Sequence, residues 1–386
     1  VDEVAVVGQG DLPARVLCQQ GLAVLGAGRS GRGISDVPDG DRVLQLFERV
    51  RPAAKHPLDR AHALITLDRL AVAGGDSRRF LPAMLQGMQP EVGLLHRLGI
   101  AEATGDCRTI LTRDDIDAVI ICSPTNMHAR MIEEVSAAGK HVFCEKPIDL
   151  QLSRVDSALA AAKKAGVKLQ IGFNRRFDPN FLRVRKAIEN GEIGEPQLLH
   201  IISRDPAPPS IDYVKVSGGM FMDMTIHDFD MARYLIGADV EEVYAAAGVT
   251  VDPAIGAAGD VDTALITLKF KNGVFATIDN CRQAVYGYDQ RVEALGKKGS
   301  VRVDNNYPNS AVVSGGDRVS RDLPLNFFME RYVESFLTEM RLFMDAVLTD
   351  AATPVSGNDA RAAMLLALAA RKSCESNRPV RIAEIG

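Results

Sequence analysis

The run Ile116-Asp-Ala-Val-Ile-Ile-Cys122 predicts a buried strand, because it is short, apolar and rich in β-branched residues. Ser123-Pro-Thr-Asn126 follows as a turn, and an amphipathic helix is expected from about residue 127 to 138. The next strand is Lys140-His-Val-Phe-Cys144, which ends in Glu145-Lys146-Pro147. Strands and helices joined by such short loops are typical of a parallel sheet with helices on both faces.

The same alternation continues with an expected helix over 153–165 and an expected strand over 168–173. We therefore predict an α/β, doubly wound parallel sheet of the Rossmann type. Ligands of such sheets bind beyond the carboxyl ends of the strands. Four polar residues share that position, namely Ser123, Glu145, Lys146 and Asn174. Their shared position predicts a site at this edge of the sheet.

The second half of the chain is richer in strands. Asn272-Gly273 is a strong hairpin signal, because both residues tolerate positive φ. Strands are expected over 197–203, 240–251, 263–270, 273–279, 291–295 and 300–303, and helices over 179–190, 327–348 and 359–376. We predict a dinucleotide-binding domain over 1–150 and an α+β domain, built on a mostly antiparallel open sheet, over 151–386.

Composition limits the class of protein. A chain of 386 residues suggests two domains, since single cores rarely grow past ~250 residues. The net charge of -5 argues against binding to nucleic acid or to anionic membranes, and no apolar run reaches the ~20 residues of a membrane span. The six cysteines are scattered without the spacing of metal ligands. We therefore expect no metal site and a reducing, cytoplasmic location.

A glycine motif lies near the N-terminus, where Leu22-Ala-Val-Leu-Gly26-Ala-Gly28-Arg-Ser-Gly31 runs from an apolar strand into G-x-G-x-x-G. Such glycines let the backbone approach a pyrophosphate. Gly26, Gly28 and Gly31 are therefore candidate cofactor-binding residues, with Glu48 as the acid that binds the ribose. A second register takes residues 43–47 as the first strand and Asp76 as that acid. The glycines favour the first register, and both acids stay open.

The stretch from Ser217 to Ile236 carries the second candidate site. Two glycines, Gly218 and Gly219, allow a sharp turn, and a helical run follows. Asp223 and His227 lie four positions apart, so on a helix they share a face. A carboxylate beside an imidazole fixes its tautomer and raises its basicity, which suits a proton acceptor. The alternative is an ordinary helix with a histidine satisfied by its neighbours.

Four sequence blocks together resemble the Gfo/Idh/MocA family of oxidoreductases. They are Cys144-Glu-Lys-Pro147, Gly172-Phe-Asn-Arg-Arg-Phe-Asp178, Ser203-Arg-Asp-Pro-Ala-Pro-Pro209 and the Asp223/His227 block. The resemblance covers roughly residues 100 to 300 and is greatest to the inositol 2-dehydrogenase branch. It implies a Rossmann domain that carries NAD, and an open C-terminal sheet through which copies form a homo-oligomer, a tetramer or a dimer.

The resemblance also implies roles for individual residues. Lys146, Asp223 and His227 match the catalytic lysine, aspartate and histidine of the family. Arg176 and Tyr286 fall where such enzymes touch the polyol, and we add Asn174 to them. Ser123 and Glu145 are expected beside the cofactor, together with the glycine loop.

The expected chemistry explains these residue types. Oxidising a secondary alcohol needs a base for the hydroxyl proton and an acceptor for the hydride. Because no side chain accepts hydride, a nicotinamide must do so. His227 would take the proton, Asp223 would orient it, and Lys146 would stabilise the developing alkoxide. We expect oxidation of myo-inositol to 2-keto-myo-inositol. The alternatives are an NADP-linked sugar oxidoreductase of the same family and a non-catalytic relative that binds a nucleotide or sugar.

Overall fold

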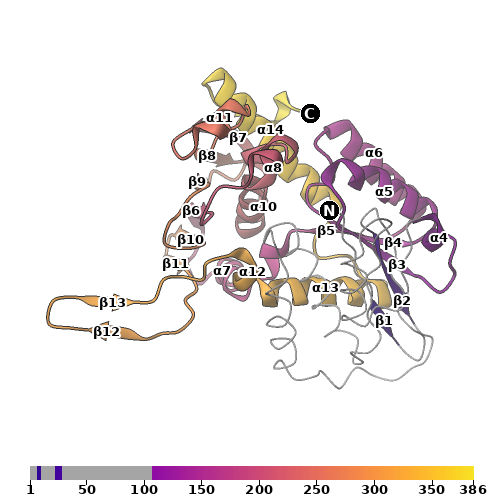
Figure 1. Ribbon diagram of the computed structural model, residues 1–386, viewed down its shortest axis with the longest axis horizontal. Helices are drawn as coiled ribbons and strands as arrows, with labels where there is room; N and C mark the ends of the chain where they lie inside the picture. Colours follow the sequence, from indigo (N-terminus) through magenta and orange to yellow (C-terminus); the bar gives the residue numbers. More distant parts are fainter. Residues whose placement is uncertain (1–6, 10–21, 28–106) are drawn as a thin grey trace. The chain divides into compact units, whose positions relative to one another are not determined.

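The computed structural model describes residues 7–9, 22–27 and 107–386, which fall into two compact units (Figure 1). The first unit ends at Gly172 and also takes in Phe336–Ala360. The second unit comprises Phe173–Ser335 and Arg361–Gly386. The boundary between the two domains was predicted from the sequence to follow residue 150. In the structure the first sheet continues past that point, because its last strand pairs with the strand that ends at Glu145.

The first unit is built on a five-stranded sheet. Its strands lie side by side in the order β1 (Val7–Gln9), β2 (Leu22–Ala27), β3 (Ala118–Ile121), β4 (His141–Glu145) and β5 (Leu169–Gly172). β3, β4 and β5 are parallel, and the helices α5 (Thr125–Ala137) and α6 (Leu152–Ala165) connect them. This strand–helix alternation confirms the predicted Rossmann-type α/β fold.

The strand β2 departs from the expected direction. It pairs with β3 in antiparallel fashion, with Leu22 opposite Ile121 and Leu25 opposite Ala118. If β2 ran parallel to β3, the predicted glycine loop after β2 would lie at the carboxyl edge of β3. Because of the antiparallel pairing, Gly26 lies near the other end of β3.

The rest of the first unit packs against this sheet. The helix α13 (Val333–Leu348) brings Phe343 onto Phe143 of β4, with the ring centroids 5.7 Å apart in an edge-to-face arrangement. The segment after α13 follows β5, where the N–H of Ile171 donates to the carbonyl of Val355 at 3.2 Å. Residues 336–360 therefore complete the first unit. The short helix α4 (Arg108–Leu111) precedes β3.

The second unit is built on a seven-stranded sheet. The strand order is β11 (Gly299–Val303), β10 (Asp289–Gly296), β6 (Pro196–Arg204), β9 (Phe275–Cys281), β8 (Thr263–Phe270), β7 (Val240–Gly248) and β14 (Val380–Arg381). Only β6 and β9 pair in parallel; the other neighbouring pairs of this sheet are antiparallel. The predicted mostly antiparallel sheet is confirmed. So is the hairpin turn between β8 and β9, where Gly273 has a φ of 86°.

One face of this sheet is covered and the other is open. Along β8 the odd-numbered residues from 263 to 269 are exposed or half-buried, whereas the even-numbered ones are buried. The buried face packs against α10 (Thr225–Ile236), which in turn contacts α7 (Pro179–Glu189). The remaining elements of this unit are η2 (Asn174–Phe177), α8 (Ile211–Val216), α9 (Met220–Asp223), α11 (Pro253–Ala257), α12 (Phe328–Arg331), the hairpin β12 (Val312–Ser314) and β13 (Val319–Arg321), η3 (Ile382–Glu384), and most of α14 (Gly357–Ser376).

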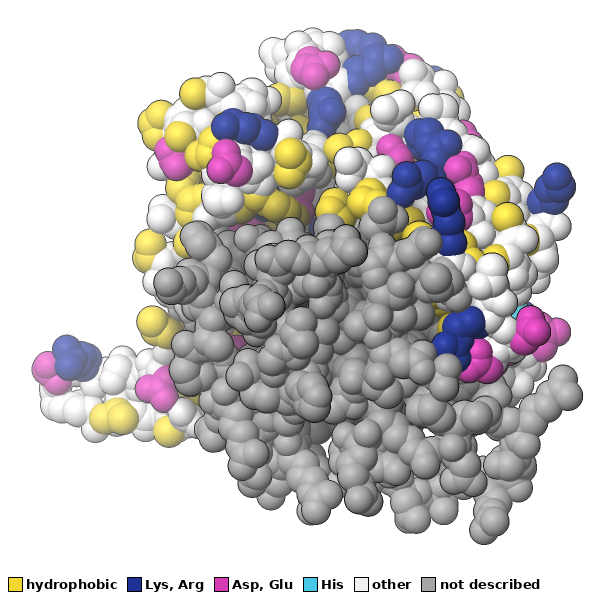
Figure 2. Space-filling model, turned by 45° about the vertical axis from the view of Figure 1, so that its right-hand side comes forward, with side chains coloured by type: hydrophobic (Ala, Val, Ile, Leu, Met, Phe, Trp, Pro, Cys, Tyr) yellow, Lys and Arg dark blue, Asp and Glu magenta, His cyan; other side chains and the backbone are white. Residues whose placement is uncertain are grey.

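The described surface mixes charges of both signs. In the face shown in Figure 2, lysines and arginines are interspersed with acidic residues rather than gathered in one basic patch. Within residues 107–386 and the two short N-terminal strands, no helix is long and apolar enough to cross a membrane. In the same residues, no group of three or more His, Cys, Asp and Glu side chains could hold a metal ion.

Candidate active site

The Asp223/His227 block forms two helices instead of the single run that the sequence predicts. Gly218 and Gly219 have φ values of 85° and 81°, so the expected glycine turn is confirmed. The helix α9 then ends at Asp223, and α10 begins at Thr225. Met224, with φ and ψ of -94° and -59°, lies between the two helices and belongs to neither. Asp223 therefore ends one helix, and the side chain of His227 projects from the first turn of the next.

The carboxylate of Asp223 is held by two side chains from outside this block. The hydroxyl of Tyr213 in α8 donates to Oδ1 at 2.8 Å. Nη2 of Arg282, just after β9, lies 2.9 Å from Oδ2. Each carboxylate oxygen thus has a named partner, and the side chain is only 11% exposed. Neither partner was predicted from the sequence; Arg282 directly follows the observed β9, which extends two residues beyond the expected strand 273–279.

Arg282 also contacts Asp205, 3.4 Å from its Nη1, so one guanidinium serves two carboxylates. Burial raises the pKa of the Asp205 carboxyl, although Arg282 acts in the opposite direction. Burial also opposes the charge of Arg282, but Asp223 and Asp205 together raise its pKa. The Asp223 carboxylate beside Tyr213 holds the pKa of that hydroxyl well above its usual range. Tyr213 therefore remains a hydrogen-bond donor to Asp223 at any physiological pH.

His227 is half-buried in the second unit. Its ring meets Phe173 edge to face, with centroids 5.8 Å apart and an angle of 87° between the planes. This contact restricts rotation of the imidazole. Orientation of His227 by Asp223 stays a prediction.

Two predicted substrate contacts, Asn174 and Arg176, lie in η2 and are buried. Arg176 makes a bidentate ion pair with Asp230 of α10, with N···O distances of 2.8 and 2.6 Å. Its guanidinium also lies 5.1 Å from the centroid of the Tyr234 ring. Arg176 therefore joins η2 to α10 in the folded protein. Contact of Arg176 or Asn174 with a polyol stays a prediction.

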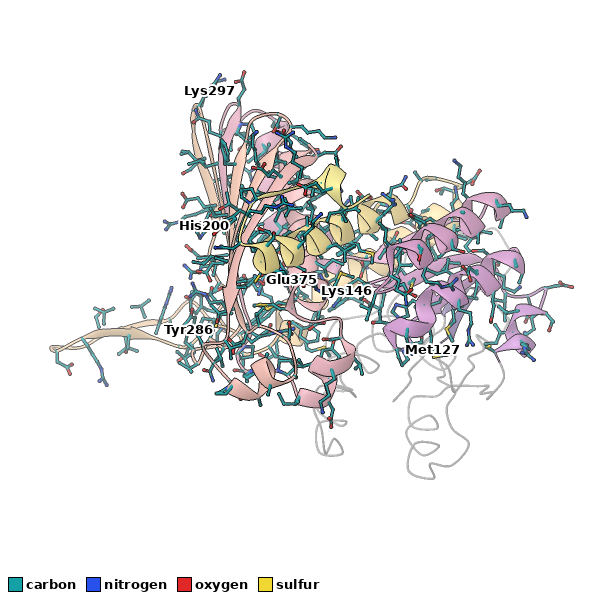
Figure 3. The ribbon with its side chains drawn as sticks, turned by 90° about the horizontal axis from the view of Figure 1, so that it is seen from above. Met127, Lys146, His200, Tyr286, Lys297 and Glu375 are labelled. Atoms are coloured by element: carbon teal, nitrogen blue, oxygen red, sulfur yellow. The ribbon has the colours of Figure 1, made fainter. Side chains whose placement is uncertain are left out.

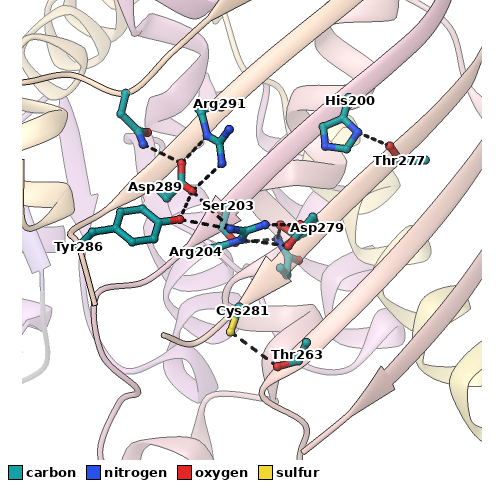
Figure 4. A network of polar contacts seen from close by, with 12 residues as sticks. His200, Ser203, Arg204, Thr263, Thr277, Asp279, Cys281, Tyr286, Asp289 and Arg291 are labelled. Carbon is teal, nitrogen blue, oxygen red and sulfur yellow. Dashed lines mark hydrogen bonds and ion pairs between the residues drawn. The ribbon is translucent and has the colours of Figure 1, made fainter. Parts of the chain in front are cut away.

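The third predicted substrate contact, Tyr286, belongs to a polar network on the open face of the second sheet (Figure 4). Its hydroxyl donates to Asp289 at 2.6 Å and accepts from Arg204 at 3.2 Å. Asp289 also accepts two hydrogen bonds from Arg291, at 2.7 and 2.9 Å. Arg204 binds Asp279 on the neighbouring strand β9. The structure thus places Tyr286 in a network with β6, β9 and β10, apart from the Asp223 cluster, and its predicted role is untested.

In the first unit, three predicted residues meet at the carboxyl edge of the sheet, as expected. Ser123 follows β3, and Glu145 ends β4. Lys146, labelled in Figure 3, comes next. The strands β3 and β4 are parallel, with Ile121 opposite Cys144, so the two loops are neighbours. The hydroxyl of Ser123 points inward and donates to the sulfur of Met131 at 3.4 Å. A cofactor could therefore reach this loop through its backbone more readily than through that hydroxyl.

This edge of the sheet has two features that fit a dinucleotide. The helix α5 begins here with Pro124 as N-cap, and no side chain caps its first N–H groups, which can therefore receive an anionic group. At Gly172 of β5, an added Cβ would come within 2.7 Å of Oε2 of Glu145, so the glycine makes room for that carboxylate. The predicted Gly28, Gly31 and Asp76 lie outside the described residues, and the structure does not bring Gly26 to this edge.

Comparison with known families matches two parts of the chain. Residues 91–173 match the oxidoreductase family with an NAD-binding Rossmann fold, and residues 181–302 match the GFO/IDH/MocA C-terminal domain. The first match begins at residue 91, so neither register of the glycine loop lies within it.

Individual relatives agree with these matches. The chain is 54% identical over 279 residues to an uncharacterized oxidoreductase, YrbE, of Bacillus subtilis, covering 72% of this chain and 82% of the relative. It is 50% identical over 291 residues to the myo-inositol 2-dehydrogenase of Thermotoga maritima, covering 75% of this chain and 86% of that protein. Among solved structures, the scyllo-inositol dehydrogenase of Lactobacillus casei with bound NAD(H) and scyllo-inositol matches with a TM-score of 0.74 and 28% identity. That match covers 86% of this chain and 97% of the other.

Proposed function

The chain belongs to the Gfo/Idh/MocA family of NAD-dependent oxidoreductases, and from this premise we propose that it oxidises a cyclic polyol, myo-inositol, to 2-keto-myo-inositol. The observation that carries the proposal is the arrangement around Asp223. Its carboxylate is held by Tyr213 and Arg282, at the end of the helix that precedes His227. The 50% identity to the myo-inositol 2-dehydrogenase of Thermotoga maritima supports this choice of substrate.

His227 is the proposed general base. It removes the proton of the substrate hydroxyl while Asp223 orients the imidazole and stabilises the imidazolium that forms. The two partners of Asp223 hold its carboxylate in place, because Arg282 supplies a positive charge and Tyr213 a hydrogen bond. The ring contact with Phe173 restricts rotation of the imidazole.

Lys146 is the proposed electrophilic group. Its ammonium would hydrogen-bond the reacting oxygen and stabilise the alkoxide charge that develops as the proton leaves. NAD, when bound, supplies the nicotinamide that accepts the hydride. The N–H groups at the start of α5 would hold the dinucleotide, with Ser123 and Glu145 beside it.

An NADP-linked sugar oxidoreductase of the same family, or a non-catalytic relative that binds a nucleotide or sugar, would share this fold. A pure binding protein has no need of Lys146, Asp223 and His227 together, so the presence of all three favours an enzyme. Titration of the protein with NADH and with NADPH, followed by turnover of myo-inositol, distinguishes the three.

The decisive variant is His227→Ala. General base catalysis contributes on the order of 10²–10⁴ to a rate, so kcat with myo-inositol and NAD should fall by that factor. The Kd for NADH should barely change, because His227 belongs to the second unit and the proposed dinucleotide contacts belong to the first. His141→Ala, at the start of β4, serves as the control and should keep its turnover.

Two further variants show whether the residues act as a unit. Lys146→Ala should also lose turnover, and the double variant with His227→Ala should be little worse than the worse single one. Near-normal turnover of His227→Ala in a folded protein would refute the mechanism.

The predicted homo-oligomer is proposed to form through the open face of the second sheet. Large apolar side chains there are between 39% and 61% exposed, namely Leu198, Leu265, Phe275 and Leu295. Exposed apolar groups gathered on one surface are typical of interfaces. The double variant Leu265→Glu/Phe275→Glu should therefore lower the molar mass measured by light scattering. Val313→Glu, on the exposed hairpin strand β12, is the control and should leave the mass unchanged. Equal molar masses for the wild type, the double variant and Val313→Glu would refute the proposal.

A further inference from the structure

His128 is a buried histidine to which the reaction above gives no role. It lies in the first turns of α5 and is 2% exposed. Its Nδ1 lies 2.8 Å from the carbonyl oxygen of Pro147, and its Nε2 lies 2.5 Å from the carbonyl oxygen of Ser123. Both ring nitrogens therefore face acceptors.

The two carbonyl groups belong to the two loops of the candidate cofactor edge. Ser123 comes just after β3, and Pro147 comes one residue after Lys146. Because β3 and β4 are neighbours in the sheet, these loops lie side by side. The imidazole spans them and determines how far apart they can be.

The proton count of the ring decides how many loops it can hold. A neutral imidazole carries one N–H, so it donates to one carbonyl, while its other nitrogen places a lone pair against the second carbonyl. An imidazolium donates to both. His128 thus holds one loop firmly when neutral and both loops when charged.

The surroundings of His128 set the balance between these forms. Burial lowers the pKa of the ring, and the ammonium of Lys146 acts in the same direction. The two carbonyl oxygens and the Asp149 carboxylate act in the opposite direction. The start of α5 also disfavours a cation, because the N-terminal end of a helix carries partial positive charge. The neutral form is therefore favoured at neutral pH.

We propose that His128 is a positioning residue for Lys146, acting by tying the Pro147 carbonyl to the Ser123 loop. The inference rests on the proposed catalytic role of Lys146. The distance between the lysine ammonium and the cofactor edge then depends on a side chain that touches neither substrate nor cofactor. A positional error of about 1 Å in a reacting group costs on the order of 10²-fold in rate.

The test compares His128→Phe, His128→Asn and His128→Gln with a matched variant, His141→Phe. His141 lies in the same sheet at the opposite end of β4, where its Nδ1 accepts from the N–H of Lys168 at 3.0 Å. Phe fills the space of the ring without an N–H, whereas the Asn and Gln amides each offer a donor at a different reach. Kinetics with myo-inositol and NAD are measured for each variant. Backbone hydrogen exchange of peptides covering 123–126 and 145–151 is measured on the free protein.

His128→Phe should lose on the order of 10- to 10²-fold in kcat with a smaller change in KM, and should exchange faster in both peptides. Either His128→Asn or His128→Gln should have a higher kcat than His128→Phe. Which of the two does so shows whether the hydrogen bond to the Ser123 or to the Pro147 carbonyl positions Lys146. His141→Phe should match the wild type in both measurements. Unchanged exchange in both peptides of His128→Phe, or normal kcat in that variant, would overturn the inference. If the wild type itself fails to oxidise myo-inositol, the proposed function fails, and the exchange measurement still decides whether His128 holds the loops.

Discussion

Replacing Arg282 by Met tests whether one buried cation holds the acidic cluster of the second unit together. The guanidinium is 4% exposed and lies 2.9 Å from Asp223 and 3.4 Å from Asp205. Met keeps much of the side-chain volume but removes the charge and all the donors. The variant therefore leaves two carboxylates close together without their shared positive partner.

The cost follows from the burial of these groups. Removing one partner of a buried ion pair costs about 3–5 kcal/mol, because the remaining charge stays out of water. Asp205 keeps a quarter of its side chain exposed, so we expect the lower end, about 3 kcal/mol. For a domain of 150–250 residues each kcal/mol lowers the melting temperature by about 2–4 °C. Arg282→Met should thus melt about 6–12 °C below the wild type.

Calorimetry at pH 7 measures this shift, and a second variant identifies its cause. Adding Asp205→Asn to Arg282→Met removes one of the two carboxylates and should recover part of the lost stability. Turnover of Arg282→Met should fall as well, since Asp223 then lacks one of the two contacts that hold its carboxylate in place. A melting temperature within 2 °C of the wild type, or no recovery in the double variant, would refute the view that Arg282 neutralises both acids.

Two further predictions concern the first unit. Because burial lowers the folded-state pKa of His128 below the ordinary 6.5, the unfolded chain takes up that proton first as the pH falls. The stability contributed by neutral His128 is therefore complete above about pH 6.5 and is lost as the pH falls toward the lowered folded-state pKa. The free energy of unfolding, measured in urea, should thus decrease more steeply from pH 7 to pH 5 for the wild type than for His128→Gln. Gly172→Ala should cost about 1–3 kcal/mol and weaken NADH binding, because its Cβ would lie 2.7 Å from Oε2 of Glu145. Its control is Gly248→Ala in β7, where an added Cβ meets nothing within 4 Å, and equal melting temperatures for the two alanine variants would contradict this prediction.

Local sequence signals predicted the elements of this fold well. The alternation of apolar and polar residues gave β8 with the bounds 263–270 that the structure shows, and Asn272-Gly273 marked the turn after it. These signals succeed because periodicity and turn chemistry are properties of neighbouring residues. The position of Ser123, Glu145 and Lys146 at one edge was predicted for the same reason, since each directly follows a recognisable strand.

Non-local pairings were not predictable in this way. The antiparallel direction of β2 depends on how distant segments meet, which no local period encodes. The break at Met224 separates Asp223 from His227 in a sequence that reads as one helix. Tyr213 and Arg282 hold Asp223. Tyr213 lies 10 residues before it in the chain, and Arg282 comes just after β9. Only the folded sheet brings them together.

The discontinuous first unit has a consequence for biosynthesis. β5 is completed by residues near 355, since the hydroxyl of Thr353 donates to the carbonyl of Leu169 at 2.9 Å and Ile171 donates to Val355. A ribosome must therefore add residues through Ala360 before this unit can close, and by then all of 173–335 has already been made. The second unit in turn requires residues 361–386. Unlike a continuous N-terminal domain, which can fold first during synthesis, the first unit reaches its final structure only after residues 336–360 are made, and the second only after residues 361–386 are made.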